Sequence, residues 1–501
     1  MSVREPETHA TPGPGGTAVP LDVLFVVSEC APLVKTGGLA DVAGSLPLAL
    51  AETGCAVRVL LPAYPGLPER LEGNQELLRF DALFGAPARV IRGSHGALDC
   101  LLLDAPHLFD REGSIYLGPN GRDWPDNDVR FAALAFAGAR IAQGGLDDGW
   151  RPGIVHCHDW QAGLVPEYLG NATGRPATVL SIHNIAFQGV FPPSAVSKLG
   201  LPASGFTPDG FEYWGNLSFL KAGLVGADAI STVSETYARE LMQPAFGMGL
   251  EGVIAARGAD MRGIVNGIDV DAWNPETDPA VQSYSRKRLQ RRKANKVRLL
   301  EEFGLEDGGG PVFGVVSRLT GQKGLDLLLD VLPRLLEHDG KLVLLGSGDA
   351  ALQKAFSEAA ERHPGQVAVM IGYDEALSHR IYAGSDVVVV PSRFEPCGLT
   401  QLYALRYGAL PLVSRTGGLA DTVIDANPAA LLAGVANGFQ FDSGSAEALA
   451  AAVERACDLF ADHKIWRKMQ MNAMAQPVGW EQSAQLYRRL YDDVLARATA
   501  E

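Results

Sequence analysis

Short apolar runs, each ended by a polar or glycine-containing turn, alternate along this chain with segments whose apolar positions recur at helical spacing. Such runs are typical of strands buried on both faces of a parallel sheet, and the segments between them of covering helices. In the first half we expect strands over residues 24–29, 56–61, 153–160, 177–182 and 228–234. In the second half we expect them over residues 312–317, 341–345, 366–371, 387–390 and 410–413.

This alternation predicts an α/β protein with two Rossmann-like, doubly wound domains that face a deep cleft. A chain of 501 residues is too long for one core and suits two or three domains. We expect a polar, Pro- and Gly-rich disordered lead-in over residues 1–20 and an N-terminal domain over 21–265. A C-terminal domain over 266–478 and a helix over 479–501 that packs back across the domains complete the expected order.

Composition narrows the class of protein. The formal net charge of −15 argues against nucleic acid or an anionic membrane as the main partner. The six cysteines contain no CxxC pair, which fits a reducing cytoplasm better than a disulfide framework or a zinc module. No apolar run approaches the roughly 20 residues that span a bilayer. We therefore expect a cytoplasmic protein with no membrane partner.

The hexapeptide TGGLAD occurs twice, over residues 36–41 and 416–421, and each copy follows a basic residue, Lys35 or Arg415. Paired glycines let a ligand approach the backbone closely, and the helix start beyond them presents free N–H groups to an anion. The plain alternative is two tight turns that close βαβ units. Two copies with basic neighbours favour a diphosphate held between two similar domains.

Two cations, Arg318 and Lys323, leave the expected strand 312–317 five positions apart, with glycines around them. A guanidinium grips phosphate oxygens bidentately, and an ammonium supplies a second compact charge. Together they could neutralise a departing diphosphate without a metal. The alternative is a solvated turn before a helix.

Glu395 follows the expected strand 387–390 and lies between Phe394 and Pro396. Its carboxylate could stabilise positive charge that develops at a sugar carbon, or it could bind sugar hydroxyls. A glycoside hydrolase would want a second carboxylate close by. The following helix offers Gln401 and Tyr403 instead.

Histidines and an aspartate end two strands of the first half. His156 and His158 alternate along one strand and could ligate zinc with Asp159, but no third histidine has suitable spacing, and both suit strand positions alone. Asp159 at the strand exit is the better candidate for contact with a substrate. His183 ends the next strand and lies either in the cleft or in the core.

The segment from Ser285 to Arg298 is strongly basic. A run of this kind usually decorates a solvated helix, and an anionic partner is the alternative.

Six motifs in this order resemble bacterial glycogen synthases, and plant starch synthases are similar. They are KTGGL (35–39), HDW (158–160), HN (183–184), Arg318 with Lys323, PSRFEPCGL (391–399) and RTGG (415–418). The resemblance runs from about Val23 to Tyr491, and the ordered set is highly specific. It implies a retaining glucosyltransferase of the two-domain GT-B fold. Such an enzyme moves glucose from ADP-glucose to the nonreducing 4-hydroxyl of an α-1,4-glucan such as glycogen, with no metal or other cofactor.

The resemblance also implies roles for single residues. Lys35 contacts the donor phosphates, Arg318 and Lys323 neutralise the departing diphosphate, and Glu395 faces the glucose ring. His183 and Asp159 lie on the acceptor and sugar side. The further substrate-binding residues implied are Gly37, Gly38, Asp41, Asn184, Tyr373 beside the base, Cys397, Gly398, Leu399, Thr400 and, from a loosely matching loop, Tyr116.

Many related retaining transferases carry a second glutamate eight positions after the first. Here that position is Tyr403, as in glycogen synthases, so the usual contact of that glutamate with the nucleotide ribose has no equivalent. Competing interpretations are a UDP-glucose-dependent synthase, a pyridoxal-phosphate-dependent glycan phosphorylase and a non-catalytic glucan-binding protein. The interpretation as a dehydrogenase has less support, because no GxGxxG motif follows the first strand.

Overall fold

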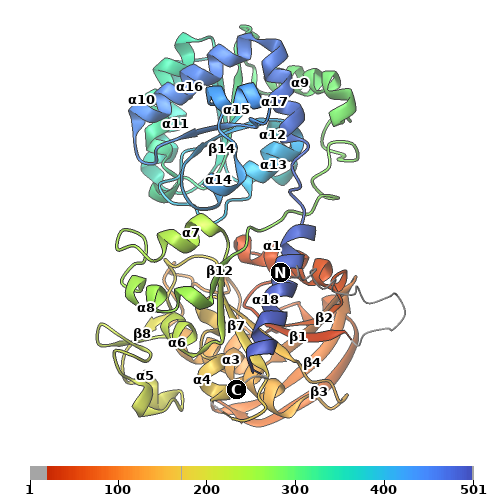
Figure 1. The fold of residues 1–501 in the computed structure, drawn as a ribbon, viewed down its shortest axis with the longest axis vertical. Helices are drawn as coiled ribbons and strands as arrows, with labels where there is room; N and C mark the ends of the chain where they lie inside the picture. The colour runs from red at the N-terminus through yellow and green to blue at the C-terminus, as the bar shows by residue number, and fades with distance from the viewer. Residues whose placement is uncertain (1–19, 171, 499–501) are drawn as a thin grey trace, which may run out of the picture.

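The computed structural model describes residues 20–170 and 172–498, which form two α/β units joined at a narrow waist (Figure 1). The predicted disordered lead-in lies outside the described residues, apart from Pro20.

The N-terminal unit is built on one large sheet. In spatial order, its described strands are β12 (Met261–Gly263), β11 (Ala229–Thr232), β7 (Ala177–Ile182), β6 (Ile154–His158), β1 (Leu21–Val26), β2 (Cys55–Pro62), β5 (Leu98–Asp104), β4 (Ala86–His95) and β3 (Glu72–Leu83). All pair in parallel except β4 and β3, which extend one edge as antiparallel strands. The seven parallel strands therefore deliver their carboxyl ends to one edge of the sheet.

Helices cover this sheet, and a small separate sheet lies beside it. The helices are α1 (Gly38–Ala51), α2 (Pro106–Phe109), α3 (Asn127–Gly144), α4 (Val165–Leu169), α5 (Ala195–Lys198), α6 (Phe219–Gly226), α7 (Glu235–Glu240) and α8 (Glu251–Ala256). The small antiparallel sheet consists of β8 (Val190–Phe191), β10 (Asn216–Ser218) and β9 (Glu212–Tyr213).

The C-terminal unit has a sheet whose described strands are all parallel. Their order is β15 (Val367–Ile371), β14 (Lys341–Gly346), β13 (Val312–Val316), β16 (Val387–Val390), β17 (Leu410–Ser414) and β18 (Phe439–Phe441). Its helices are α9 (Lys293–Phe303), α10 (Leu325–Glu337), α11 (Ala350–Arg362), α12 (Glu375–Gly384), α13 (Thr400–Tyr407), α14 (Gly417–Thr422), α15 (Pro428–Ala433), α16 (Ala446–Ala461) and α17 (His463–Ala473). The four consecutive valines of β16 are fully buried, because helices cover both faces of the strand.

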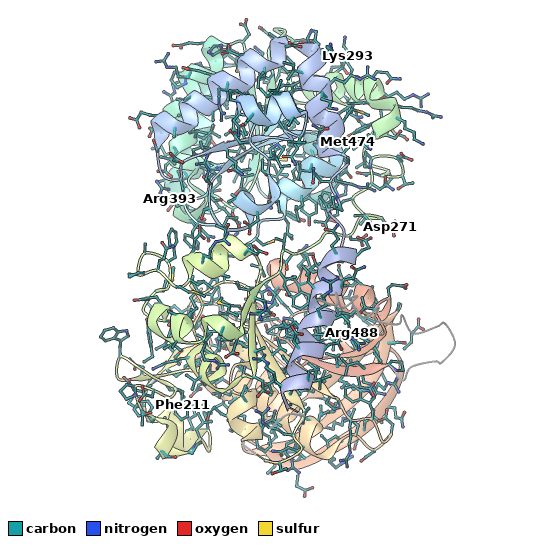
Figure 2. All side chains as sticks on the ribbon, viewed as in Figure 1. Phe211, Asp271, Lys293, Arg393, Met474 and Arg488 are labelled. Atoms are coloured by element: carbon teal, nitrogen blue, oxygen red, sulfur yellow. The ribbon has the colours of Figure 1, made fainter. Side chains whose placement is uncertain are left out.

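The last helix, α18 (Glu481–Ala498), returns to the N-terminal unit, as Figure 1 shows. Tyr487, Leu490 and Tyr491 from this helix belong to the N-terminal core. The hydroxyl of Tyr491 lies 2.8 Å from Nδ1 of His156 on β6. On the outer side of the same helix, the Arg488 guanidinium donates to the carbonyl of Gly54 over 3.2 Å (Figure 2).

Two chain crossings connect the units and touch each other. The N–H of Ile268 donates to the carbonyl of Val478 over 2.9 Å. A Cβ atom at Gly267 would lie 2.6 Å from the backbone of Gly479, so only glycine fits between the two crossing segments.

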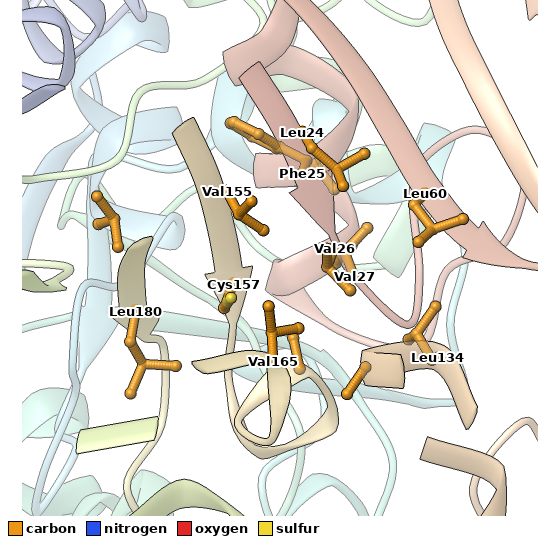
Figure 3. Packing of buried hydrophobic residues seen from close by; sticks show 14 of the residues in the cluster. Leu24, Phe25, Val26, Val27, Leu60, Leu134, Val155, Cys157, Val165 and Leu180 are labelled. Carbon is orange, nitrogen blue, oxygen red and sulfur yellow. The ribbon is translucent and has the colours of Figure 1, made fainter. Parts of the chain in front are cut away.

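The N-terminal core is packed around β1. Figure 3 shows its side chains between those of β6, β2 and the covering helices. Helix α3 approaches β1 so closely that a Cβ atom at Gly138 would lie 2.9 Å from a methyl group of Val26. This contact holds the central strand rigidly under the loop that follows it.

Candidate active site

The predicted site residues come from loops at the carboxyl ends of the parallel strands in both sheets. Those loops meet at the waist, where the hydroxyl of Ser234 donates to the carbonyl of Pro396 over 2.7 Å. The loop after β16, which carries Glu395, therefore lies directly against the N-terminal unit. Ligands of doubly wound folds bind at this edge of the sheet.

Glu395 and Lys323, predicted separately from two loops, form an ion pair. The Lys323 ammonium lies 2.5 Å from Oε2 of Glu395, and the hydroxyl of Ser392 donates to the same oxygen over 2.8 Å. The Glu395 side chain is only 9% exposed, and that of Lys323 is 17% exposed. Ser392 was not predicted, although it lies three residues before Glu395 in the quoted motif; burial and the ion pair fix the carboxylate in one orientation.

Arg318 lies on the same loop as Lys323 and behaves differently. It is exposed, and it makes no ion pair with any other residue that the structure describes. The loop thus presents one cation held by a carboxylate and one that is free for an anion.

The backbone after Glu395 is tightly ordered. Gly398 has a φ of +72°, which favours glycine. The buried Gln401 side chain donates to the carbonyls of Cys397 and Gly398 over 3.0 and 2.9 Å. Leu399 and Thr400, at the start of α13, are partly exposed. Gln401, considered in the sequence only as a missing carboxylate, instead holds the loop predicted to surround the sugar.

The first TGGLAD copy is open to solvent. Lys35, Gly37 and Gly38 are exposed, and a Cβ atom at Gly38 would meet no described atom within 4 Å. Lys35 pairs with Asp41 over 2.7 Å. Nothing in the surrounding protein requires glycine at Gly38, so the space above it is available to a ligand.

A carboxylate missed by the sequence analysis supports this loop. Oε2 of Glu29 accepts hydrogen bonds from the N–H groups of Thr36 and Gly37 over 2.5 and 3.1 Å. The hydroxyl of Tyr116 donates to Oε1 of Glu29 over 3.1 Å. Burial raises the pKa of Glu29, while the two N–H groups and Tyr116 lower it. The signal in the sequence was an acidic residue at the strand exit, eight positions before the glycine pair.

The second TGGLAD copy is closed, which corrects the prediction that both copies hold a diphosphate. A Cβ atom at Gly417 would overlap the carbonyl oxygen of Glu395, and one at Gly418 would overlap that of Cys397. The carboxylate of Glu240, on α7, accepts from the Thr416 hydroxyl and the Gly417 N–H over 2.9 and 3.1 Å. The N–H groups at the start of α14 are thus already bonded to protein.

The histidines form a buried column. The rings of His156 and His158 stack with centroids 4.2 Å apart, and Nδ1 of His158 lies 3.0 Å from Nε2 of His183. Both ring nitrogens of His156 have protein partners, Tyr491 and Ser181. Burial lowers the pKa of His183 to about 4 and that of His156 to about 3. These rings are neutral at pH 7, and His183, partly exposed, is the member that reaches the surface.

Asp159, predicted to contact a substrate, is buried and bonded to the next loop. Oδ1 accepts a 2.7 Å hydrogen bond from the N–H of His183. Burial raises the pKa of Asp159 to about 7, although the N–H groups of His183 and Asn184 lower it. Asp159 has a φ of +54°, in the left-handed region. This carboxyl group orients the loop that carries His183 and Asn184.

Tyr373 and Asn184 remain accessible. Tyr373 is 72% exposed, and its hydroxyl donates to Oε2 of Glu375 over 3.0 Å. Asn184 is partly exposed, and its Oδ1 accepts from the N–H of Ala186 over 3.0 Å. The Tyr373 ring thus stays open to a ligand although its hydroxyl is paired with a carboxylate, and Oδ1 of Asn184 is bonded to a backbone N–H group.

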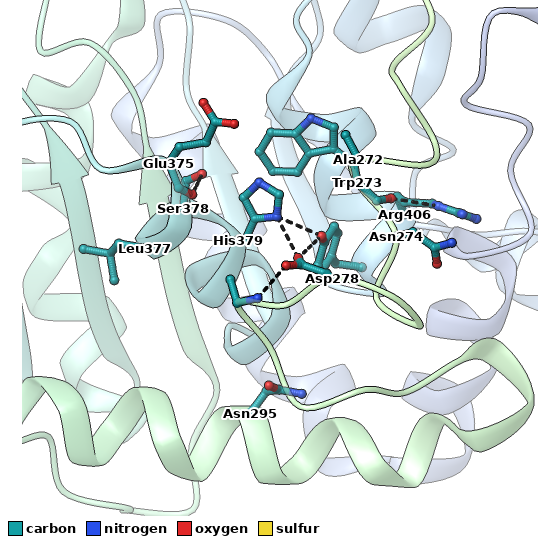
Figure 4. A network of polar contacts seen from close by, with 12 residues as sticks. Ala272, Trp273, Asn274, Asp278, Asn295, Glu375, Leu377, Ser378, His379 and Arg406 are labelled. Atoms are coloured by element: carbon teal, nitrogen blue, oxygen red, sulfur yellow. Dashed lines mark hydrogen bonds and ion pairs between the residues drawn. The ribbon is translucent and has the colours of Figure 1, made fainter.

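Tyr403, at the position of the second glutamate, lies in an aromatic stack. Trp273 lies between Tyr403 and His379, with ring centroids 3.8 Å away on each side. Figure 4 shows that His379 is held in turn by the buried Asp278, 2.7 Å from its Nδ1. The carbonyl of Trp273 accepts from Arg406 on α13 over 3.0 Å. A packed ring therefore replaces a charge at this position.

Two features are absent from residues 20–170 and 172–498 of the structure. No group of three or more His, Cys, Asp or Glu side chains in these ranges could hold a metal ion. No helix in the same ranges is long and apolar enough to cross a membrane.

Comparisons with known proteins agree with this geometry. Residues 22–256 match the family described as starch synthase catalytic domain, and residues 298–470 match glycosyl transferases group 1. A glycogen synthase of Roseobacter denitrificans is 57% identical over 95% of this chain and 100% of its own length. A glycogen synthase of Rhizobium rhizogenes is 51% identical over 95% and 100%.

A solved structure supports the same assignment. The catalytic domain of starch synthase IV from Arabidopsis thaliana, bound to ADP and acarbose, superposes with a TM-score of 0.84. It is 31% identical, and the match covers 95% of this chain and 100% of that one. The two Rossmann-like units thus have the GT-B arrangement of glycosyltransferases. The chain belongs to the family of bacterial glycogen synthases and plant starch synthases.

Proposed function

We propose that this protein is a glycogen synthase that transfers glucose from ADP-glucose to the nonreducing 4-hydroxyl of an α-1,4-glucan, with retention of configuration. The observation that carries the proposal is the Lys323–Glu395 ion pair next to the unpaired Arg318, at the edge where the two units meet. The names of the relatives and the ADP bound to the Arabidopsis enzyme support it.

In the proposed reaction, the bond between the glucose C1 and the β-phosphate oxygen breaks, and that oxygen leaves with the electron pair. Arg318 and Lys323 neutralise the charge that gathers on the diphosphate, and Lys35 binds the phosphates from the opposite unit. As Lys323 turns to the phosphate, its pairing with Glu395 weakens. The Glu395 carboxylate then stabilises the positive charge at C1.

The acceptor hydroxyl then attacks C1 from the face that the diphosphate leaves. A phosphate oxygen of the departing ADP takes the hydroxyl proton, so the balance needs no other base. His183 is neutral at pH 7 and forms a hydrogen bond with the sugar, as donor or as acceptor. Asp159 orients His183 by accepting a hydrogen bond from its backbone N–H. We assign Gly37, Gly38, Asp41 and Asn184 to substrate contacts, together with Cys397, Gly398, Leu399 and Thr400 around the sugar.

Tyr373 and Tyr403 are proposed to lie on the nucleotide side. The exposed Tyr373 ring can flank the base, and Tyr116 acts indirectly by holding Glu29 under the phosphate loop. Within this proposal the partners are ADP-glucose and glycogen, the location is the cytoplasm, and no metal takes part. The six cysteines are buried and free. We also propose the domain limits 21–265 and 266–478, followed by the helix that packs back across the domains, of which residues 499–501 lie outside the described residues.

The test is transfer of glucose from ADP-glucose and from UDP-glucose onto glycogen, with EDTA present. Rapid transfer from ADP-glucose alone supports the proposal. Transfer from UDP-glucose alone would keep the reaction and overturn the donor. No transfer from either would favour a non-catalytic glucan-binding protein, and an absorbance band of bound pyridoxal phosphate would favour a phosphorylase.

A further inference from the structure

A group of exposed cations lies outside the candidate active site, at the start of the basic run. Arg286, Lys287, Arg288 and Arg291 are exposed in the segment just before α9, and none forms an ion pair with another described residue. Two cations depart from the expected solvated run. Arg292 is buried and donates to the carbonyl of Tyr407 over 3.0 Å, and the ammonium of Lys296 lies 2.7 Å from Oδ2 of Asp386.

These unpaired cations stand out because acidic residues outnumber basic ones by 58 to 43 in this chain. Several other arginines of the same domain have carboxylate partners; Arg380, for example, lies 2.8 Å from Glu302. Four neighbouring positive charges repel one another, which costs stability unless an anion relieves it. The local charge balance therefore points to an anionic ligand.

The four cations line one hollow of about 510 Å³. This volume is within the range of pockets for small molecules, about 300–1,000 Å³. The rim is anchored, because Nε of Arg286 donates to the carbonyl of Met471 on α17 over 2.9 Å. Tyr284, which also lines the hollow, is buried and donates its hydroxyl to the carbonyl of Tyr407 over 2.8 Å.

Of the remaining polar lining residues, Glu276 is not suited to a bare anion. Ser283 and Ser285 supply hydroxyl groups, and Glu276 supplies a carboxylate. The Ser283 hydroxyl donates to the carbonyl of Glu276 over 2.9 Å, so it meets a ligand as an acceptor. A carboxylate repels phosphate but accepts hydrogen bonds from sugar hydroxyls. The hollow thus has one part for a phosphate group and one for a hydroxylated group.

We propose that this hollow binds a hexose phosphate, with the phosphate on Arg288, Arg291 and Lys287 and the sugar hydroxyls on Glu276 and the two serines. The site is separate from the cleft between the domains; Lys293, at the start of α9, lies toward the outer end of the C-terminal domain in Figure 2. The inference goes beyond glucan synthesis and does not depend on it.

The experiment is calorimetric titration of the full chain with glucose 1-phosphate, glucose 6-phosphate and inorganic phosphate, in the presence of saturating ADP, which is meant to fill the cleft. The test variant is K287Q/R288Q/R291Q. The matched control, K293Q/R298Q/K354Q, removes the same charge from exposed positions of the same domain that do not line the hollow.

We expect at least one hexose phosphate to bind the wild type and the control equally, and the test variant at least tenfold more weakly. Inorganic phosphate should bind the wild type at least fivefold more weakly than that hexose phosphate. Equal weakening in both variants would show a general charge effect and overturn the site. Equal affinity for inorganic phosphate would overturn the sugar assignment, and absence of binding by both sugar phosphates would overturn the proposal.

Discussion

The carboxylate of Glu240 accepts a 3.1 Å hydrogen bond from the N–H of Gly417, so a side chain of the N-terminal domain caps a helix of the C-terminal domain. Thr416 donates its hydroxyl to the same oxygen over 2.9 Å. Next to this contact, the N–H of Thr236 donates to Asp421 over 2.9 Å. Helices α7 and α14 are therefore joined across the waist by charged caps.

Replacing Glu240 with alanine should weaken this joint. The Gly417 N–H and the Thr416 hydroxyl would lose their acceptor, at a cost of about 1–2 kcal/mol. We expect a lower Tm in differential scanning calorimetry. The control is Glu235→Ala on the same helix, whose exposed side chain lies 3.8 Å from Arg239. Equal loss in both variants would mean that the cap adds nothing beyond surface charge.

A glycine-to-alanine substitution should affect substrate binding in the first TGGLAD copy and stability in the second. Gly38→Ala adds a methyl group where the protein leaves open space, so Tm should stay the same while the KM for ADP-glucose rises severalfold. Gly418→Ala forces a methyl group against Cys397, so Tm should fall by several degrees. Calorimetry and initial-rate kinetics on both variants check this. A destabilised Gly38→Ala protein with normal KM would contradict the assignment of an open loop.

Glu395→Gln should lower kcat by roughly 10²-fold or more and change the KM for ADP-glucose little, because the charge matters most when C1 becomes positive. Steady-state kinetics and ADP titration separate the two effects. Ser392→Ala, which removes one hydrogen bond to the same oxygen and keeps the charge of Glu395, serves as the mild comparison. Parallel losses of kcat and donor affinity in Glu395→Gln would assign the residue to ground-state binding.

Asp159 should make stability depend on pH. Its pKa is about 7 in the folded protein and about 3.9 in an unfolded chain. Between these values the folded state holds a proton that the unfolded state has lost, so the contribution of Asp159 to stability falls as pH rises from about 4 to 7 and then levels off.

Asp159→Asn lacks this titration and keeps an oxygen for the His183 N–H. We therefore expect the Tm of the variant, relative to wild type, to rise between pH 5 and pH 7.5. Thermal unfolding at both pH values measures it. A constant difference would show that Asp159 is ionised throughout this range.

Tyr491→Phe should destabilise the N-terminal domain by about 1 kcal/mol, because His156 loses its buried hydroxyl partner. Tyr491→Ala should cost about 3–5 kcal/mol through the cavity that it leaves. Tyr373→Phe, which removes an exposed hydroxyl, is the control. Unfolding followed by circular dichroism measures the loss of stability, which we expect to be largest for Tyr491→Ala, smaller for Tyr491→Phe and smallest for the control. Equal Tm values for Tyr491→Phe and wild type would contradict a stabilising hydrogen bond.

The sequence predicted the parallel strands well where apolar runs were uninterrupted, as in β16 and β17, because both faces of those strands are covered. The motifs in the sequence also assigned Lys323 and Glu395 to the same site. The sequence could not distinguish the two TGGLAD copies, since their difference lies in what packs above them. The loop 395–397 fills the space over Gly417 and Gly418, whereas the space over Gly38 is empty.

Other features were hidden for a related reason. Glu240 accepts from a backbone N–H group that is distant in the sequence, so no spacing rule identifies it. Glu29 stands at a strand exit, but that position alone does not reveal the N–H groups of Thr36 and Gly37 that it accepts from. Asp159 stood at a strand exit, as predicted, but its left-handed backbone and burial turn the carboxyl group toward the next loop. Local patterns located these side chains without indicating what they face.

The return of α18 also sets an order of assembly during synthesis. The strands of the C-terminal sheet are contiguous in the chain, from Val312 to Phe441, so that sheet can form as soon as its own residues have been made. The N-terminal core includes Tyr487, Leu490 and Tyr491 and must wait until these residues have left the ribosome. Although domains generally fold from the N-terminus onward, here the half made first is the half completed last.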